Sequence, residues 1–337
     1  MKTAPPRPLL AARPLVEGLA FPEGPRWQAG RLYFSDIHGH RVFRLEPDGR
    51  SREIAELADR VSGLGFLPDG RLLAVSMLDR RLVAIAVGCA VGGDSDDIGE
   101  PTVHAELASL SGRFINDMVV DGIGRAYVGS RNGGTPDSLS DCLIRVEPDG
   151  TASVEVSGLA SPNGAVITPD GRALILAETA DGRLLRFPIR SDGSLGPREV
   201  VFEAPGFHLD GICLDAAGGI WAGGGVHGLL RIRPDFELEA VFEAPGRMVL
   251  ATALGGPDGR TLFLATVGRV LLENLAKVGF DRSLVDPNIH TLTRTDRRRG
   301  TNRRPIRLRN NRVAAREHLQ GTHRIQARCE CARARSI

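Results

Sequence analysis

The sequence predicts an all-β protein, specifically a six-bladed β-propeller of four-stranded antiparallel blades. A polar, Gly-containing turn followed by a short apolar run recurs six times, at spacings of 40, 54, 47, 47 and 41 residues. A second series of turns lies between them, so each unit of about 45 residues holds two hairpins and hence four strands. Gly is abundant (41 of 337 residues) and aromatic residues are scarce (5%), which favours short strands and tight turns over helices.

The first turn of each unit is marked by a glycine that stands just before the apolar run. In chain order these glycines are Gly30, Gly70, Gly124, Gly171, Gly218 and Gly259. The second turns are "EPDGR" near Asp48, Gly92-Gly93, "EPDGT" near Asp149, "SDGS" near Asp192 and "RPDF" near Asp235. One unit cannot bury both faces of its sheet, whereas six units packed face to face around an axis can. This favours a propeller over a β-sandwich with coincidental turns.

The sixth unit is incomplete on its C-terminal side. Its first two strands are expected at Ala251–Leu254 and Arg260–Thr266, and Arg269–Glu273 is a candidate third strand. The segment Arg13–Gly18 precedes the first blade. We expect it to supply the fourth strand, because closure by an N-terminal strand leaves no free sheet edge. The predicted propeller therefore spans residues 13–275.

Residues 276–337 are expected to form a separate, Arg-rich, disordered tail. Residues 291–337 contain 14 arginines and three acidic residues, whereas residues 1–290 carry a net charge of −9. No aromatic residue interleaves with these arginines, as a reader of single-stranded nucleic acid would need, so nucleic acid is not an expected partner. The chain has only two lysines, Lys2 and Lys277, which indicates GC-rich codons. We hypothesise that a frameshift or a read-through produced the tail.

Neither a signal peptide nor a transmembrane span is expected, because no apolar run of sufficient length follows Lys2 and Arg7. The cysteines are odd in number and lack the spacing of a metal site; they are Cys89, Cys142, Cys213, Cys329 and Cys331. We therefore expect a cytoplasmic protein with reduced thiols and no membrane partner.

Counting back from the first-turn glycines identifies one level of the six innermost strands. Seven residues before Gly30 and eight before each of the others, the positions are Glu23, Ser62, Asn116, Asn163, Asp210 and Ala251. Equivalent positions of a propeller converge on its channel, so two carboxylates would meet without a Lys or Arg at that level, and their pKa values would rise. A divalent cation resolves this conflict, because carboxylate and amide oxygens suit Ca²⁺, Mg²⁺ or Mn²⁺. The alternative is a water-filled polar channel without an ion.

Four segments carry these positions in the derived register. They are "FPEGPRW" (Phe21–Trp27), "NDMVVD" (Asn116–Asp121), "SPNGAVITPDG" (Ser161–Gly171) and "LDGICLD" (Leu209–Asp215). Together they resemble the gluconolactonase, regucalcin and senescence-marker-protein family of six-bladed lactonases, over about residues 13–266. The resemblance implies that Glu23, Asn163 and Asp210 bind one divalent cation (Ca²⁺, Zn²⁺, Mg²⁺ or Mn²⁺). It also implies that Asn116 contacts the substrate or a water, and that Asp210 is the catalytic base.

The activity that this resemblance implies is metal-assisted hydrolysis of a small-molecule substrate, a sugar lactone or similar cyclic ester. The cation would polarise the lactone carbonyl while Asp210 deprotonates the attacking water. The alternatives are another six-bladed hydrolase, paraoxonase-like or strictosidine-synthase-like, and a non-catalytic propeller that binds a metal or a ligand. Near the same mouth of the channel, Glu178 is a candidate pocket or supporting group and Arg113 a candidate substrate contact.

Overall fold

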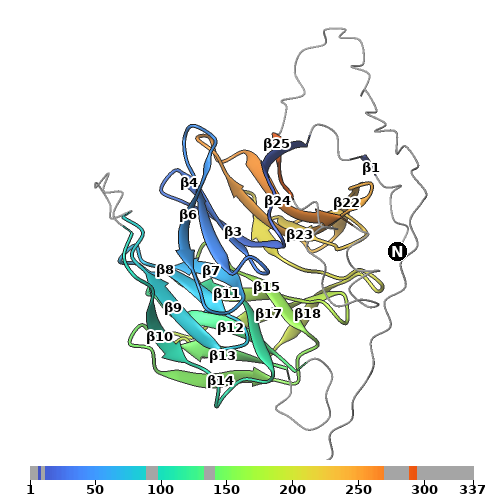
Figure 1. Cartoon of the computed structure of the whole chain (residues 1–337). Helices are drawn as coiled ribbons and strands as arrows, with labels where there is room; N and C mark the ends of the chain where they lie inside the picture. Colours follow the sequence, from blue (N-terminus) through green and yellow to red (C-terminus); the bar gives the residue numbers. More distant parts are fainter. Residues whose placement is uncertain (1–6, 9–11, 89–97, 133–140, 269–287, 294–337) are drawn as a thin grey trace, which may run out of the picture. The chain divides into compact units, whose positions relative to one another are not determined.

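The structure, a computed structural model, describes residues 7–8, 12–88, 98–132, 141–268 and 288–293, all within the unit Met1–Thr295. The regular elements of these residues are β-strands (Figure 1). No helix in the described part of the chain is long and apolar enough to cross a lipid bilayer. Five of the sheets are four-stranded and antiparallel and are arranged as the blades of a propeller, which confirms the predicted all-β architecture for that part of the chain.

Four of these five sheets are built from consecutive strands. They are β3 (Pro22–Gln28), β4 (Arg31–Asp36), β5 (Arg41–Leu45) and β6 (Ser51–Glu56); β7 (Val61–Phe66), β8 (Leu72–Ser76), β9 (Arg81–Ile85) and β10 (Thr102–Glu106); β11 (Phe114–Val120), β12 (Ala126–Arg131), β13 (Cys142–Val146) and β14 (Ala152–Ser157); and β15 (Pro162–Ile167), β16 (Ala173–Glu178), β17 (Arg183–Pro188) and β18 (Glu199–Glu203). In each sheet the strand order follows the chain order, so every connection between neighbouring strands is a hairpin.

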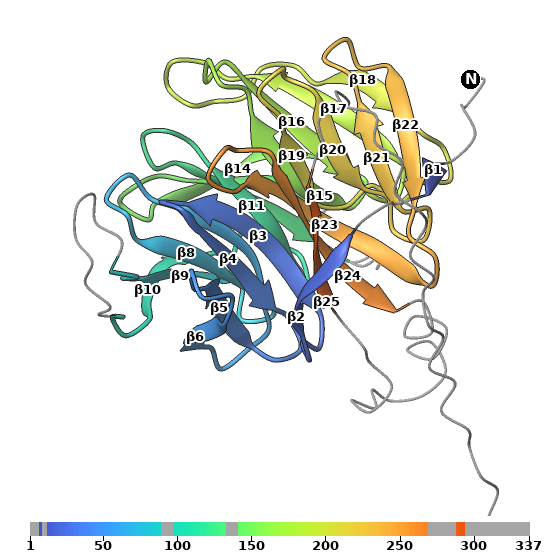
Figure 2. The same ribbon diagram turned by 90° about the horizontal axis from the view of Figure 1, so that it is seen from above.

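The remaining two sheets recruit strands from the N-terminal part of the chain. One holds β19 (Ile212–Leu214), β20 (Ile220–Gly223), β21 (Leu229–Ile232) and β22 (Leu238–Glu243), and then β1 (Arg7–Pro8), which pairs with β22 in parallel. The other holds β23 (Arg247–Gly255), β24 (Thr261–Gly268), β25 (Asn288–Thr293) and β2 (Arg13–Glu17), in that order. In Figure 2 the blue strand β2 lies at the edge of the sheet that contains the orange strand β24, and β25 pairs with both of them.

The last of these sheets differs from its predicted form. The N-terminal segment joins it at the outer edge, as expected for Arg13–Gly18. The candidate third strand, Arg269–Glu273, lies outside the described residues, and β25 takes the third position by pairing with β24. β25 falls inside the segment 276–337 that was assigned to the tail. A strand therefore occurs where tail was expected, while the rest of that segment lies outside the described residues.

The first turns set the register of the inner strands. All six first-turn glycines adopt a left-handed conformation, with φ between 67° and 99°, which glycine tolerates without a Cβ clash. The innermost strands β3, β7, β11, β15, β19 and β23 contact one another in this order, and β23 also contacts β3. The inner strands thus form a closed ring, and residues at the same distance from their turns lie at a common level of that ring.

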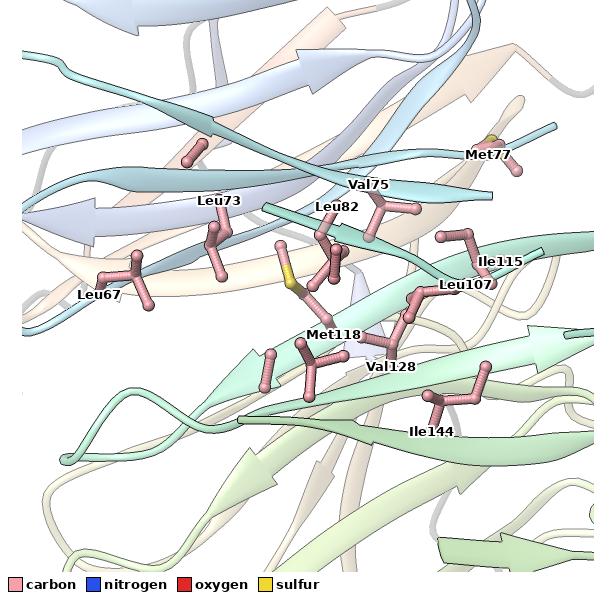
Figure 3. Close-up of a cluster of buried hydrophobic side chains, with 14 of the residues drawn as sticks. Leu67, Leu73, Val75, Met77, Leu82, Leu107, Ile115, Met118, Val128 and Ile144 are labelled. Carbon is pink, nitrogen blue, oxygen red and sulfur yellow. The ribbon is translucent and has the colours of Figure 1, made fainter. Parts of the chain in front are cut away.

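Apolar side chains fill the space between neighbouring sheets. The second strands β4, β8 and β16 are almost completely buried, because they have a neighbouring sheet on either side, whereas the outer strands β6, β10 and β14 are partly exposed. Figure 3 shows one such layer, in which Leu73 and Val75 of β8 face Met118 of β11 and Val128 of β12. Burying each of these side chains contributes about 1.5–3 kcal/mol, so the packing between sheets holds the inner strands in place.

Candidate functional site

Regular strand pairing is interrupted where the predicted site residues lie. In the first hairpin of each of five sheets, the register shifts near the end opposite the first turn. The shift in β11 spans Asn116, the shift in β15 spans Asn163, and the shift in β3 begins at Glu23. Asp210 lies two residues before β19 begins. An irregularity of this kind turns side chains out of the alternation of a strand, and it is typical of strands that carry functional groups.

Glycines next to the level positions allow neighbouring inner strands to approach closely. A Cβ on Gly164, which follows Asn163, would lie 2.6 Å from the backbone oxygen of Asp210. A Cβ on Gly63 would lie 2.7 Å from the Cα of Asp117. No side chain fits at these distances, so the strands meet backbone to backbone. The close approach expected at Gly164 is confirmed, and it brings Asn163 next to Asp210.

Asn163 lies at the centre of a hydrogen-bonded chain. The residue is 6% exposed, and its Oδ1 accepts a hydrogen bond from Nδ2 of Asn116 at 3.0 Å. Its own Nδ2 donates to Oγ1 of Thr179 at 2.9 Å, and this hydroxyl donates to the backbone oxygen of Leu209 at 2.7 Å. Two of the predicted site residues, Asn116 and Asn163, are therefore in direct contact.

The backbone just before Asn163 is held in an unusual conformation. Ser161 has a φ of 59°, which is rare for a residue with a side chain. Its amide donates to Oδ2 of Asp141 at 2.9 Å, its carbonyl accepts from the amide of Thr179 at 3.0 Å, and its hydroxyl accepts from Arg131 at 3.0 Å. These three contacts fix the start of β15 and therefore the place of the Asn163 side chain.

The two predicted carboxylate ligands are electrostatically strained. Glu23 and Asp210 are both half-buried. Burial raises the pKa of Glu23 well above its usual range, and the negative charges of Asp210 and Asp117 raise it further. Burial and the negative charge of Asp117 raise the pKa of Asp210 to about 7, although a hydrogen bond with the side chain of Asn163 lowers it. A hydrogen bond from the amide of Gly24 to Oε2 of Glu23, at 3.0 Å, partly favours the ionised form of Glu23.

Three charged residues that the sequence did not predict also act on this site. Asp117 is buried and forms an ion pair with Arg26, with 3.3 Å between Oδ1 and Nη2. Arg131, at the end of β12, opposes the rise in the pKa of Asp210. No Lys or Arg stands at the six positions of the level, but Arg26 and Arg131 act on its carboxylates from neighbouring positions. Two sequence features could have identified Asp117 and Arg131 as site residues. Asp117 directly follows Asn116, and Arg131 is the last residue of β12, the second strand of the third sheet.

The remaining two positions of the level have packing roles. The hydroxyl of Ser62 donates to the backbone oxygen of Asn116 at 2.5 Å, and the backbone oxygen of Ser62 accepts from the hydroxyl of Ser35 at 2.6 Å. Ala251 faces Gly211, where an added Cβ would lie 2.4 Å from the Cβ of Ala251. Ser62 and Ala251 therefore join neighbouring inner strands, and the polar side chains of the site come from the other four positions.

The two candidates near the mouth of the channel have different outcomes. Glu178 is fully buried, accepts a hydrogen bond from the amide of Ala160 at 2.6 Å and pairs with Arg183. It supports the backbone that leads into β15 rather than presenting its carboxylate to a ligand. Arg113 is exposed. Arg131, rather than Arg113, is the arginine that influences Asp210.

The fit of this site to a cation can be judged from its donors. The described residues hold no group of three or more His, Cys, Asp or Glu side chains suited to a metal. The predicted set is of another composition, because it combines two carboxylates with the amide oxygen of Asn163. The pKa values of both carboxylates are raised. A bound cation would lower them again, because its positive charge favours the ionised forms. The donors therefore fit a cation that prefers oxygen ligands.

Comparison with known proteins gives a consistent set of similarities. Residues 21–268 match the family described as SMP-30/Gluconolactonase/LRE-like region. A pentonolactonase from Haloferax volcanii is 30% identical over 252 residues, which cover 73% of this chain and 81% of the relative. A 6-deoxy-6-sulfogluconolactonase from Pseudomonas putida is 29% identical over 259 residues, which cover 72% of this chain and 82% of the relative.

Solved structures share the fold. The calcium-binding protein regucalcin from Agrobacterium tumefaciens has a TM-score of 0.67 at 24% identity, covering 86% of this chain and 97% of that one. A gluconolactonase from Xanthomonas campestris has a TM-score of 0.65 at 22% identity, covering 87% of this chain and 95% of that one.

Proposed function

Because the chain belongs to the SMP-30/Gluconolactonase/LRE-like family, we propose that it is a divalent-metal-dependent hydrolase that opens a sugar lactone or a similar cyclic ester. The names of its pentonolactonase and sulfogluconolactonase relatives support this substrate class. The observation that carries the proposal is the convergence of four polar residues, Glu23, Asn116, Asn163 and Asp210, at one level of the inner strands. Asn116 and Asn163 are hydrogen-bonded, and the charge of Asp210 raises the pKa of Glu23.

The proposed metal ligands are Glu23, Asn163 and Asp210. The cation, Ca²⁺, Zn²⁺, Mg²⁺ or Mn²⁺, would act as a Lewis acid that polarises the lactone carbonyl and acidifies water. Its positive charge would offset the repulsion between two carboxylates that burial has already made costly to ionise. The family's regucalcin neighbour is described as calcium-binding, which supports a divalent cation without identifying it.

The residues of the chain would supply the proton transfers and the binding contacts. Asp210 accepts a proton from the attacking water, whose oxygen adds to the lactone carbonyl carbon. The bond between this carbon and the ring oxygen then breaks, and Asp210 returns the proton to the leaving oxygen, which yields a hydroxy acid. With the cation bound, its positive charge would lower the pKa of Asp210 that burial has raised, so the carboxylate would be ionised and able to accept the proton. Asn116 would hold the substrate or the water through its side-chain amide.

Two further assignments belong to this proposal. We count the sheet of β19–β22 as a blade, which gives six blades around the ring of inner strands, with β1 as an added edge strand. We also place the enzyme in the cytoplasm, and the free thiols of Cys142 and Cys213 support this placement.

A panel of lactones, assayed on metal-stripped protein with each cation restored in turn, tests the function. We expect hydrolysis of at least one sugar lactone that disappears with the metal and returns with it. Asp210→Ala should lose both metal binding and turnover. The matched control is Asp258→Ala at an exposed turn, where Asp258 accepts a hydrogen bond from the amide of Arg260, and it should retain both. Lactonase activity in Asp210→Ala would contradict the assignment, and metal binding without hydrolysis would favour a non-catalytic propeller.

A further inference from the structure

We propose that Thr179 is a positioning residue that fixes the amide of Asn163 with its oxygen toward the cation site. This inference rests on the proposed function, because it assigns a role toward the same metal ligands. Thr179 directly follows β16 and touches two of them, through the Asn163 side chain and through the backbone just before Asp210. Neither contact is apparent from the spacing of residues in the sequence.

The direction of each hydrogen bond follows from the chemistry of its atoms. The backbone oxygen of Leu209 can only accept, so the hydroxyl of Thr179, 2.7 Å away, must donate its single proton to it. Thr179 can then only accept at its remaining lone pairs. The group of Asn163 that lies 2.9 Å from this hydroxyl must therefore be the NH₂ group. The orientation of the amide is thus determined by its partners, although nitrogen and oxygen look alike in shape.

The opposite orientation of the amide would be unfavourable. It would place Oδ1 of Asn163 against a hydroxyl whose proton is already committed, so two acceptors would face each other. It would also turn the NH₂ group toward the place that Oδ1 now occupies, where it accepts from Nδ2 of Asn116 at 3.0 Å. In the observed orientation, Oδ1 has a second lone pair for a cation. An amide nitrogen offers a cation no such lone pair.

The hydroxyl of Thr179 is itself held in place by the backbone. The amide of Thr179 donates to the carbonyl of Ser161 at 3.0 Å, two residues before Asn163. The amide of Asp210 donates to the carbonyl of Gly223 at 2.9 Å, which fixes the segment that contains Leu209. Thr179 therefore links the start of β15 to the approach to β19, and its hydroxyl has little freedom to move.

The Kd for Mn²⁺ tests the positioning role of Thr179 independently of catalytic activity. Mn²⁺ alone is titrated into the metal-stripped full chain, and the free ion is counted by electron paramagnetic resonance. Thr179→Val keeps the shape of the side chain and removes the hydroxyl, and it should raise the Kd for Mn²⁺ about 10- to 100-fold, as loss of a ligand-orienting partner typically does. Thr179→Ser retains the hydroxyl and should stay within about threefold of the wild type.

The matched control is Thr168→Val in the far turn of the same hairpin. The hydroxyl of Thr168 bonds to Asp170 and to the amide of Ala173, so this variant loses comparable hydrogen bonds away from the site. Its Kd for Mn²⁺ should equal that of the wild type. Thermal unfolding of each metal-stripped variant shows that it is folded under the titration conditions.

A double-mutant cycle separates orientation from a merely structural effect. In an Asn163→Asp background both side-chain atoms are oxygens, so there is no amide to orient, and Thr179→Val should change the Kd for Mn²⁺ by less than about threefold. An equal loss in both backgrounds would overturn the positioning role, as would an unchanged Kd in Thr179→Val alone. If the wild type binds no Mn²⁺, the proposed metal site itself is contradicted, and this inference fails with it.

Discussion

Replacement of Gly164 by alanine tests whether the close approach of inner strands builds the site. The added methyl would lie 2.6 Å from each of three backbone atoms, the oxygen of Asp210, the Cα of Gly211 and the nitrogen of Ile212. None of them can rotate away, because they belong to the backbone. The amide of Gly211 is bonded to the carbonyl of Leu250 at 2.8 Å, which holds this segment against the next inner strand as well.

The size of the effect follows from this geometry. Relief of the three contacts requires β15 and the segment before β19 to separate by about 1 Å, and forcing one extra methyl into a packed site costs about 1–3 kcal/mol. We expect the upper end of this range, about 3 kcal/mol off the free energy of unfolding, because only backbone can give way. The same displacement would part Asn163 from Asp210, so the Kd for Mn²⁺ should also rise by at least about tenfold.

Urea unfolding of the metal-stripped chain measures the first effect, and Mn²⁺ titration measures the second. The matched control is Gly122→Ala, because Gly122 lies in an exposed turn with no atom within 4 Å of an added Cβ. Its free energy of unfolding should change by less than about 1 kcal/mol. If Gly164→Ala unfolds like the control and binds Mn²⁺ like the wild type, the inner strands are not held at the distance on which the site depends.

Two other predictions follow from the buried acids. Between about pH 4 and 7, folded Asp210 holds a proton that the unfolded chain has released, so the free energy of unfolding of metal-stripped protein should fall as pH rises, by up to about 4 kcal/mol from this group. Urea titrations across this range should show the fall, and Asp210→Asn should reduce it; a rise in the wild type would contradict the raised pKa. Glu178→Gln, which loses the ion pair with Arg183, should lower the free energy of unfolding by about 1–3 kcal/mol and leave the Kd for Mn²⁺ unchanged. A higher Kd for Mn²⁺ in this variant would instead show that Glu178 contributes to the metal site.

The sequence was sufficient to place the level at which the polar residues meet, because that level depends on short-range features. A tight turn with a left-handed glycine, such as Gly171, fixes where its two strands begin. A count of eight residues back from this glycine then reaches the other end of the inner strand, at Asn163, and the count is the same in every unit except the first, where it is seven. The packing of one sheet on the next does not alter this count. The position of the site can therefore be predicted from the turn residues and the length of the inner strand.

The contacts around this level could not be predicted from the sequence, because they join segments that are far apart in the chain. Asp117 acts on Glu23 from the third sheet, and Arg131 reaches Asp210 from the end of a second strand. Asp117 lies where the pairing of β11 is irregular, so strand periodicity does not predict where its side chain points, and Arg131 is the last residue of β12, where the alternation ends. The strand β25 was missed for a related reason. It joins its sheet after residues 269–287, and so it lies outside the spacing shared by the other units.

The segment from Ser161 to Gly164 shows how local and distant constraints combine at one ligand. The first turn places Asn163 at the level of the site, and the absence of a Cβ on Gly164 lets Asp210 approach from the next sheet. These two features decide where the side chain is, but they do not decide which atom of its amide faces the channel. That choice depends on Thr179, whose proton is committed to the carbonyl before Asp210, and on the hydrogen bond between the Asn163 side chain and Asp210 itself. The residue type and position of a ligand can thus be found by counting along the chain, whereas the orientation of its donor atom depends on a hydrogen bond that only the folded sheets bring together.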